Sequence, residues 1–236
     1  MKIKTKILLV VAGLMAIGLF GMIGDSSPSG RGQSPTGSLF PSGSLVSSSY
    51  GYLRYRLIDN RSAVEIVSFR GGITAPLPSE VGPVQIPSHI GGLPVIRIRE
   101  RVFTRPASGT SSVRLAGYEG MGVTHACLPY TLTDIGDRSF YRNRLTNVDI
   151  PSGVTHIRRH AFERNNIRSV YIPHGVEHIG VRAFQNNNIG SITIPDSVQY
   201  IGALAFRQNQ ITAVSVPHHT VIADNSFDRD VMVTRR

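Results

Sequence analysis

The pattern of apolar and polar residues repeats with a period of 22 residues between Leu128 and Pro217. A proline opens each unit. Aliphatic residues follow at the third and sixth positions after it, a phenylalanine at the eleventh and an asparagine at the fourteenth. Three further aliphatic positions lead to the next proline. The aligned phenylalanines are Phe140, Phe162, Phe184 and Phe206, and the aligned asparagines are Asn143, Asn165, Asn187 and Asn209. Agreement in seven columns over four units indicates a tandem structural repeat.

A period of roughly 20 to 29 residues with sparse aliphatic anchors is typical of a solenoid of the leucine-rich-repeat type. A single coil cannot bury its own apolar face, so each coil depends on its neighbours in the stack. The Val-x-Ile segment before each proline has a period of two, which predicts a short strand with its aliphatic side chains inside the coil. The isoleucine at the sixth position predicts a second extended segment, and the Ala-Phe pair predicts a short helical turn. The expected fold is therefore a β-rich solenoid of parallel strands and short helical turns.

The asparagine column predicts a structural role. A short amide side chain can satisfy backbone groups at a tight bend and tolerates a left-handed backbone conformation. Amides stacked in one column can also form hydrogen bonds from coil to coil. We therefore expect these four asparagines to hold successive coils together.

The chain begins with a basic segment that contains Lys2, Lys4 and Lys6, followed by an uncharged apolar run from Ile7 to Gly24. This order predicts that residues 1–24 are a secretory signal peptide or an uncleaved N-terminal membrane anchor. In both cases the lysines stay in the cytoplasm and the rest of the chain is exported, to the periplasm, the outer surface or the medium. Residues 25–48 are rich in Ser, Gly and Pro and predict a flexible linker.

Residues 49–80 predict a β-hairpin that covers the first coil of the solenoid. Leu53, Tyr55 and Leu57 alternate with polar residues, and a turn follows before Val64 and Ile66 resume the pattern. The solenoid itself is expected over residues 81–236, with about six coils and a degraded, polar last coil. The coil that precedes Pro129 carries an insertion around residues 105–122, which is rich in Gly and Ser and predicts a protruding loop.

The chain is strongly basic outside its first residues. All three lysines precede residue 7, and 22 arginines remain against 15 acidic residues. An arginine-rich rim can attract acidic polymers such as glycosaminoglycans, or anionic lipid headgroups, but it can also serve only to keep the solenoid soluble. The arginines that cluster where coils turn are Arg138, Arg142, Arg144, Arg158, Arg159, Arg164, Arg168, Arg182 and Arg207. Nucleic acid is a poor candidate partner, because no nucleic-acid-binding motif is present.

Motifs for catalysis, cofactors or metals are missing from the pattern. No serine stands in a nucleophile elbow, and no glycine-rich phosphate loop follows a strand. His156 and His160 are four residues apart, but that spacing forms a zinc pair only on a helix, and the repeat places the two histidines in different columns. Cys127 is the single cysteine, which excludes an internal disulfide and leaves pairing with a second chain open. We expect neither an enzyme nor a cofactor or metal site.

The outward positions of the predicted strands offer a contact surface. With strands roughly 4.8 Å apart, the stack forms an open face that suits a protein segment or a glycan better than a small metabolite. Tyr171 is the one aromatic residue in these columns and the natural anchor for a partner. The predicted contact residues are Cys127, Asp149, Tyr171, Thr193 and Ser215 in one column and Asn147, Ser169 and Ser191 in a second. The alternative interpretation is that these columns are merely solvated.

The run Ile-Pro-x-x-Val-x-x-Ile-Gly-x-x-Ala-Phe occurs at residues 172–184 and again at residues 194–206. It resembles the BspA-like leucine-rich repeats of bacterial surface proteins, the class also called TpLRR. Residues 86–95 are similar to the first coil of that family, and the hairpin before them is similar to its N-terminal cap. The resemblance implies a curved, right-handed solenoid that is exported or displayed, without catalytic residues. It implies action by protein–protein contact, such as host attachment or cell–cell association.

Two functional hypotheses follow. The first is an exported cell-envelope or cell-surface module that presents its strand face to a protein ligand of a host or bacterial surface. The alternative is binding to an acidic polysaccharide, another polyanion or an anionic membrane surface through the arginine rim. A third interpretation is a structural envelope protein without a soluble ligand.

Overall fold

The computed structural model describes residues 44–48, 51–71, 82–106 and 118–236. These residues belong to one compact unit that spans residues 38–236. Residues 1–24, the expected signal peptide or anchor, lie outside the described residues, as does most of the expected linker. The last part of that linker is not irregular, because Ser44–Ser48 forms strand β1 and pairs antiparallel with β2. Within the described part of the chain, no helix is long and apolar enough to cross a membrane.

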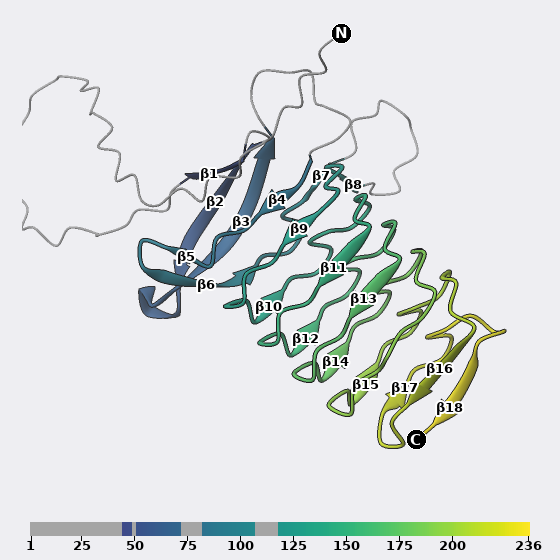
Figure 1. Ribbon diagram of the computed structural model, residues 1–236. Helices are drawn as coiled ribbons and strands as arrows, with labels where there is room; N and C mark the ends of the chain where they lie inside the picture. Colours follow the sequence, from purple (N-terminus) through teal and green to yellow (C-terminus); the bar gives the residue numbers. More distant parts are fainter. Residues whose placement is uncertain (1–43, 49–50, 72–81, 107–117) are drawn as a thin grey trace, which may run out of the picture. The chain divides into compact units, whose positions relative to one another are not determined.

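Most of the strands join one ten-stranded sheet, in the order β1-β2-β3-β6-β10-β12-β14-β15-β17 with β5 paired to β6 (Figure 1). From β6 onward along this order the neighbours are parallel, and each coil contributes one short strand. Its strands are β1 (Ser44–Ser48), β2 (Gly51–Ile58), β3 (Ala63–Gly71), β5 (His89–Ile90), β6 (Leu93–Ile98), β10 (Asp134–Ile135), β12 (His156–Ile157), β14 (His178–Ile179), β15 (Tyr200–Ile201) and β17 (Val221–Ile222).

Shorter two-stranded sheets lie on the other side of most coils. Three of them are parallel pairs of neighbouring coils, which is the arrangement that the period of two predicts. The parallel pairs are β4 (Val84–Gln85) with β9 (Ala126–Cys127), β11 (Asn147–Asp149) with β13 (Ser169–Tyr171), and β16 (Ala213–Val216) with β18 (Met232–Arg235). The fourth pair, β7 (Thr104–Pro106) with β8 (Tyr118–Gly120), is antiparallel and frames the predicted insertion, of which residues 107–117 lie outside the described part.

A hairpin stands at the N-terminal end of the solenoid. Strands β2 and β3 pair antiparallel and are joined by the short 3-10 segment η1 (Asp59–Arg61). Strand β3 also pairs in parallel with β6, the first long strand of the repeats. The ring of Phe69 on β3 lies 5.5 Å from that of Phe103, so the apolar face of the hairpin continues the core of the coils.

The core is built around one row of aromatic rings. Successive phenylalanines of the repeat stack with interplanar angles of 5° to 15° and ring centroids 4.7 to 5.5 Å apart. Offset stacking of this kind adds to the free energy gained by removing the rings from water. The row consists of Phe103, Phe140, Phe162, Phe184, Phe206 and Phe227. Each ring occupies the same place in its coil, as the 22-residue period predicts.

The residues around each phenylalanine form consecutive hydrogen-bonded turns, and no α-helix occurs among the described residues. The amide of Ser139 donates to the carbonyl of Gly136, and that of Tyr141 to the carbonyl of Arg138. The N–H of Phe140 points instead to the next coil, where it donates to Ala161 at 2.9 Å. Because this donor is used between coils, the segment keeps the short turns that the sequence pattern predicts and does not extend into an α-helix.

Each asparagine of the repeat links its own coil to the coil before it. Asn187 Oδ1 accepts the N–H of Ile167 at 3.0 Å, while its Nδ2 donates to the carbonyls of Phe162 at 2.9 Å and Phe184 at 3.1 Å. Asn165 and Asn209 make the same set of bonds in their own coils. The expected coil-to-coil role of this column is therefore confirmed.

The polar last coil closes the stack with a side chain. In the inner coils, the amide of Asn186 donates to the carbonyl of Arg207 in the next coil. One coil later the acceptor is a carboxylate, because Asp228 Oδ2 accepts the N–H groups of Gln208 at 2.8 Å and Asn209 at 3.2 Å. Asp228 thus takes the place of a backbone carbonyl in the repeating pattern.

Replacing Asn187 with Ala should lower the free energy of unfolding by about 2–4 kcal/mol, because one amide donor and two carbonyls lose their partner in a buried position. Asn188→Ala is the matched control, since its side chain is exposed and its backbone bond to Ile167 is retained. Urea denaturation of both variants measures the difference. Equal stability of the two variants would show that the asparagine column does not hold the coils together.

Replacing Asp228 with Ala should destabilise the last coil by about 1–2 kcal/mol, because two backbone N–H groups lose a charged acceptor. Hydrogen exchange should then accelerate at the amides of Gln208 and Asn209 while the amides of the inner coils are unaffected. The neighbouring exposed residue provides the control Asp230→Ala, which should leave these exchange rates unchanged.

Candidate binding face

The predicted contact residues lie on the outer side of the short strands, and all eight are exposed. On β11 and β13 they are in register, Asn147 opposite Ser169 and Asp149 opposite Tyr171. Cys127 on β9 pairs with Gln85 on the adjacent strand β4. The eight residues are Cys127 on β9, Asn147 and Asp149 on β11, Ser169 and Tyr171 on β13, Ser191 and Thr193 on the following coil, and Ser215 on β16.

Six of these residues line one shallow groove of about 420 Å³, which we call the contact groove. The six are Asn147, Asp149, Ser169, Tyr171, Ser191 and Thr193. Cys127 and Ser215 lie outside its lining. The sequence predicted an open face, and in the structure this face contains a groove that extends over three successive coils.

The polar lining of the contact groove includes three residues that the sequence analysis did not single out, namely His174, Asp196 and Arg236. His174 and Asp196 each come directly after the proline of their repeat unit, Pro173 and Pro195. The repeat position after the proline was therefore the sequence signal that could have identified them. No repeat column points to Arg236, because it belongs to the degraded last coil. Its Nη2 donates at 2.8 Å both to the carbonyl of Ile194 and to Asp196 Oδ1.

The contact groove combines an exposed aromatic residue with polar side chains. Tyr171 is 62% exposed and lies in register with Asp149 on the neighbouring strand. Serine, threonine and asparagine side chains supply hydrogen-bond donors and acceptors around this ring. The carboxylate of Asp196 is paired with Arg236, whereas Asp149 has no ion pair within the described part of the chain.

A larger cavity of about 500 Å³ lies at the C-terminal end of the repeats, between Arg207–Thr212 and Asn225–Asp230. It is where the rows of phenylalanine and asparagine end. None of the eight predicted contact residues lines it.

Two histidines of the large sheet stack in one column of the repeat. His156 and His178 are opposite each other on β12 and β14, and their rings stack 4.7 Å apart. His160 lies elsewhere, against Glu163 in a turn. No group of three His, Cys, Asp or Glu side chains able to hold a metal ion occurs among the described residues.

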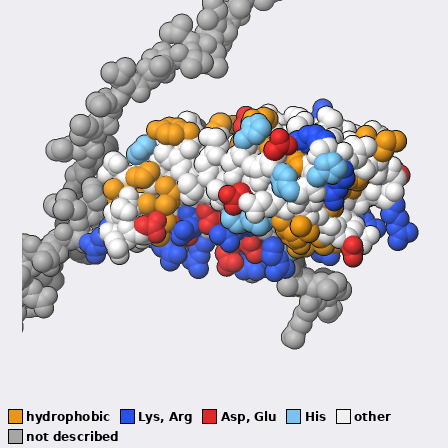
Figure 2. All heavy atoms as spheres, turned by 90° about the horizontal axis from the view of Figure 1, so that it is seen from below, with side chains coloured by type: hydrophobic (Ala, Val, Ile, Leu, Met, Phe, Trp, Pro, Cys, Tyr) orange, Lys and Arg blue, Asp and Glu red, His pale blue; other side chains and the backbone are white. Residues whose placement is uncertain are grey.

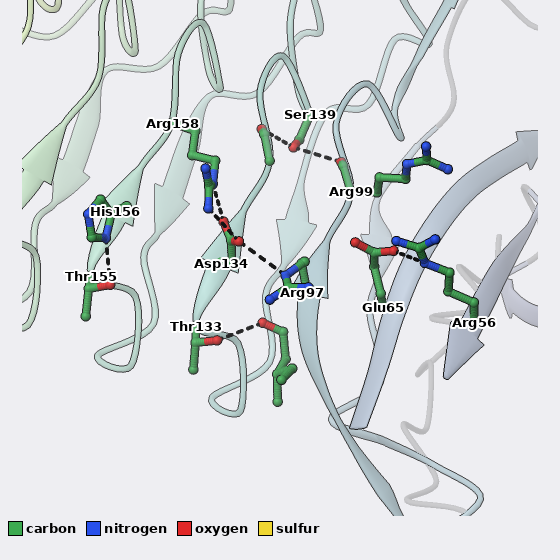
Figure 3. Close-up of polar contacts among 12 residues, drawn as sticks. Arg56, Glu65, Arg97, Arg99, Thr133, Asp134, Ser139, Thr155, His156 and Arg158 are labelled. Atoms are coloured by element: carbon green, nitrogen blue, oxygen red, sulfur yellow. Dashed lines mark hydrogen bonds and ion pairs between the residues drawn. The ribbon is translucent and has the colours of Figure 1, made fainter. Parts of the chain in front are cut away.

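The arginines are interspersed with acidic side chains on the face shown in Figure 2, so they do not form a continuous basic patch there. The large sheet illustrates this arrangement (Figure 3). Asp134 lies between Arg97, at 3.2 Å, and Arg158, whose Nε and Nη2 donate at 2.6 and 2.9 Å. The hydrogen bonds to Asp134 raise the pKa of the Arg158 guanidinium above its usual range. Glu65 on β3 is paired with Arg56 on β2.

Comparison with solved structures shows the same fold in a bacterial protein. A leucine-rich repeat protein from Bacteroides ovatus is 21% identical, with a TM-score of 0.55, and the match covers 78% of this chain and 51% of that protein. The chain therefore spans about half the length of that relative. The Treponema pallidum leucine-rich repeat protein TpLRR is also 21% identical, with a TM-score of 0.49, over 78% of this chain and 83% of the other. A comparison with curated proteins gives no match.

Comparison with protein families identifies the repeat. The model described as the BspA type leucine rich repeat region matches residues 115–233 in six copies. This range is half of the chain, and it contains the aligned phenylalanines and asparagines that stack in the structure from Phe140 onward. The sequence pattern, the stacked coils and the six matched copies agree, and the chain belongs to the family of proteins with BspA-type leucine-rich repeats.

Proposed function

We propose that this protein is an exported interaction module of the bacterial cell envelope or cell surface, and that it binds a protein ligand through the contact groove. The observation that carries the proposal is the convergence of six predicted contact residues, from three successive coils, on one groove whose lining includes an exposed tyrosine. Solenoids commonly bind partners across surfaces built from neighbouring repeats. Attachment to a host surface is the use that the family resemblance favours.

The shape of the contact groove favours a macromolecular ligand. A site for a small metabolite normally encloses most of its ligand, whereas this groove is shallow and lies on an open strand face. Tyrosine is enriched among the residues that dominate protein–protein binding energy, because it buries a large rigid ring and keeps a polar tip. The surrounding hydroxyl and amide groups resemble the polar rim that surrounds such an anchor. We assign no catalytic step to the protein.

Tyr171→Ala should weaken binding to the protein ligand at least about 10-fold, as expected for loss of a central aromatic anchor. Tyr130→Ala is the matched control, because Tyr130 is 74% exposed but does not line the contact groove. Surface plasmon resonance of the full-length variants against candidate host and bacterial surface proteins measures both affinities. Equal affinity of the Tyr171 variant and the natural protein for every ligand found would place binding outside the groove.

The same measurement over a series of salt concentrations distinguishes binding through the contact groove from binding through the arginine-rich rim. Binding carried by exposed arginines should weaken steeply as the salt concentration rises, because solvent-exposed charges are screened. Binding anchored by Tyr171 should depend only weakly on salt. A steep salt dependence together with an unchanged Tyr171→Ala affinity would favour a polyanion or an anionic membrane surface as the partner.

We expect residues 1–24 to direct the export of the protein. Deletion of these residues should leave the protein in the cytoplasmic fraction, because the basic start and apolar run that direct export are then missing. The full chain should be recovered from the envelope or the medium. Cell fractionation of both forms, with the mature N-terminus located by mass spectrometry, measures the outcome. Recovery of the full chain from the cytoplasm would contradict the export proposal.

A further inference from the structure

The pairing of the short strands is interrupted inside the contact groove. Strand β11 pairs with β13, and β16 pairs with β18, but the segment Gly190–Ile194 between them is not a strand. Within the described part of the chain, residues 190–194 make no backbone–backbone hydrogen bond to either neighbouring coil. We call this interruption, bordered by β13 on one side and β16 on the other, the seam.

The interruption is local, because coil-to-coil bonds are intact on both sides of it. Before the seam, Asn188 donates to Ile167 at 2.8 Å and Gln210 donates to Ile189 at 2.9 Å. After it, the amide of Gln199 donates to Glu177 at 2.8 Å. The ring of Phe184 keeps its usual spacing to the rings of the coils before and after it, at 5.3 and 5.5 Å. At this coil the loss of pairing is therefore confined to the short-strand side.

A glycine marks the start of the seam. Gly190 stands in the column that holds Thr146, Arg168 and Thr212 in the other coils. That column is paired elsewhere, since Arg168 donates to the carbonyl of Thr146 at 2.9 Å and Met232 to that of Thr212 at 2.9 Å. Glycine weakens a strand because it has greater backbone freedom to lose and no side chain to pack. A glycine at this position therefore lowers the strand propensity of the segment that follows it.

The seam exposes groups that other coils bury. Val170 and Ile192 are partly exposed, whereas the equivalent Val148 and Val214 are only 2% and 4% exposed. Backbone groups of folded proteins are almost always paired, with protein groups or with water. One seam carbonyl already has a substitute donor, because Arg236 donates to Ile194 at 2.8 Å. The remaining backbone groups of the seam stay available to a ligand in the groove.

We propose that the seam binds an extended peptide segment of the protein ligand, one that carries a basic side chain. This inference rests on the proposed function and specifies its partner. The backbone of an extended peptide alternates N–H and C=O groups, so it can form hydrogen bonds with the unpaired backbone groups of the seam. Its side chains can contact the partly exposed apolar residues Val170 and Ile192.

The charge of the groove specifies the basic side chain. Asp149 has no ion pair among the described residues, and it lies in register with the exposed ring of Tyr171. A lysine or arginine placed there meets a carboxylate and an aromatic face together. The chain itself provides an example, because Arg236 follows strand β18 and sets its guanidinium against Ile194 and Asp196.

The variant Gly190→Thr tests the seam directly. No atom lies within 4 Å of a Cβ built at Gly190, so the threonine of the neighbouring coils fits without a clash. It should favour strand pairing and raise Tm, since replacing a glycine also restricts the unfolded chain. If the ligand uses the unpaired groups of the seam, the same variant should bind less well although it is more stable.

The probe is a phage-displayed library of random peptides of roughly 10 residues, long enough to cross several coils. We expect the full-length protein to select peptides that contain Lys or Arg. Selected peptides should slow hydrogen exchange at the amides of Ser191–Ile194 and bind Gly190→Thr at least about 10-fold more weakly. Tyr130→Ala again serves as the control and should bind them normally.

The outcomes separate the inference from the function it rests on. Loss of binding in Tyr171→Ala with full binding in Gly190→Thr would contradict peptide binding at the seam, while the contact groove would remain the binding site. Full binding in both variants would overturn both. Selection of no peptide, with binding to a glycan array instead, would also overturn the peptide assignment.

Discussion

Hydrogen bonding between successive coils is the constraint on which the rest of this structure depends. A coil of 22 residues is too small to form its own core, and its turns leave backbone groups without partners inside the coil. Each asparagine of the repeat supplies partners for such groups. Its side chain accepts an N–H of the preceding coil and donates to the phenylalanine carbonyls of that coil and of its own coil. Asn187 is therefore as much a part of the core as Phe184, although it is polar.

The direction of these bonds explains the turn geometry and the end of the stack. Amides of the turn donate forward, as Phe140 does to Ala161, and amides at the end of the strand of the large sheet donate backward, as Gly180 does to Ile157. A terminal coil therefore needs a substitute acceptor for its forward donors. Asp228 supplies one with its carboxylate, and the hairpin strand β3 covers the opposite end.

The candidate site lies where this repeating pattern is broken. Features that violate the local rules of a fold are often retained at functional positions, because regular pairing leaves nothing for a partner to bind. Here Gly190 replaces the larger residue of its column, the short-strand pairing stops, and the groove forms over the interruption. The exposed ring of Tyr171 borders the same interruption.

The sequence alone determined the period, the identity of the stacked columns and the faces of the short strands. Those features depend on residue spacing, and Phe140 and Asn165 lie where the spacing placed them. The tertiary structure decided the rest. The Ala-Phe segment is a pair of turns because its donors are used by the next coil. The groove includes Arg236 and the seam residues Ser191–Thr193 because contacts across coils, and not spacing within one coil, set which groups find partners.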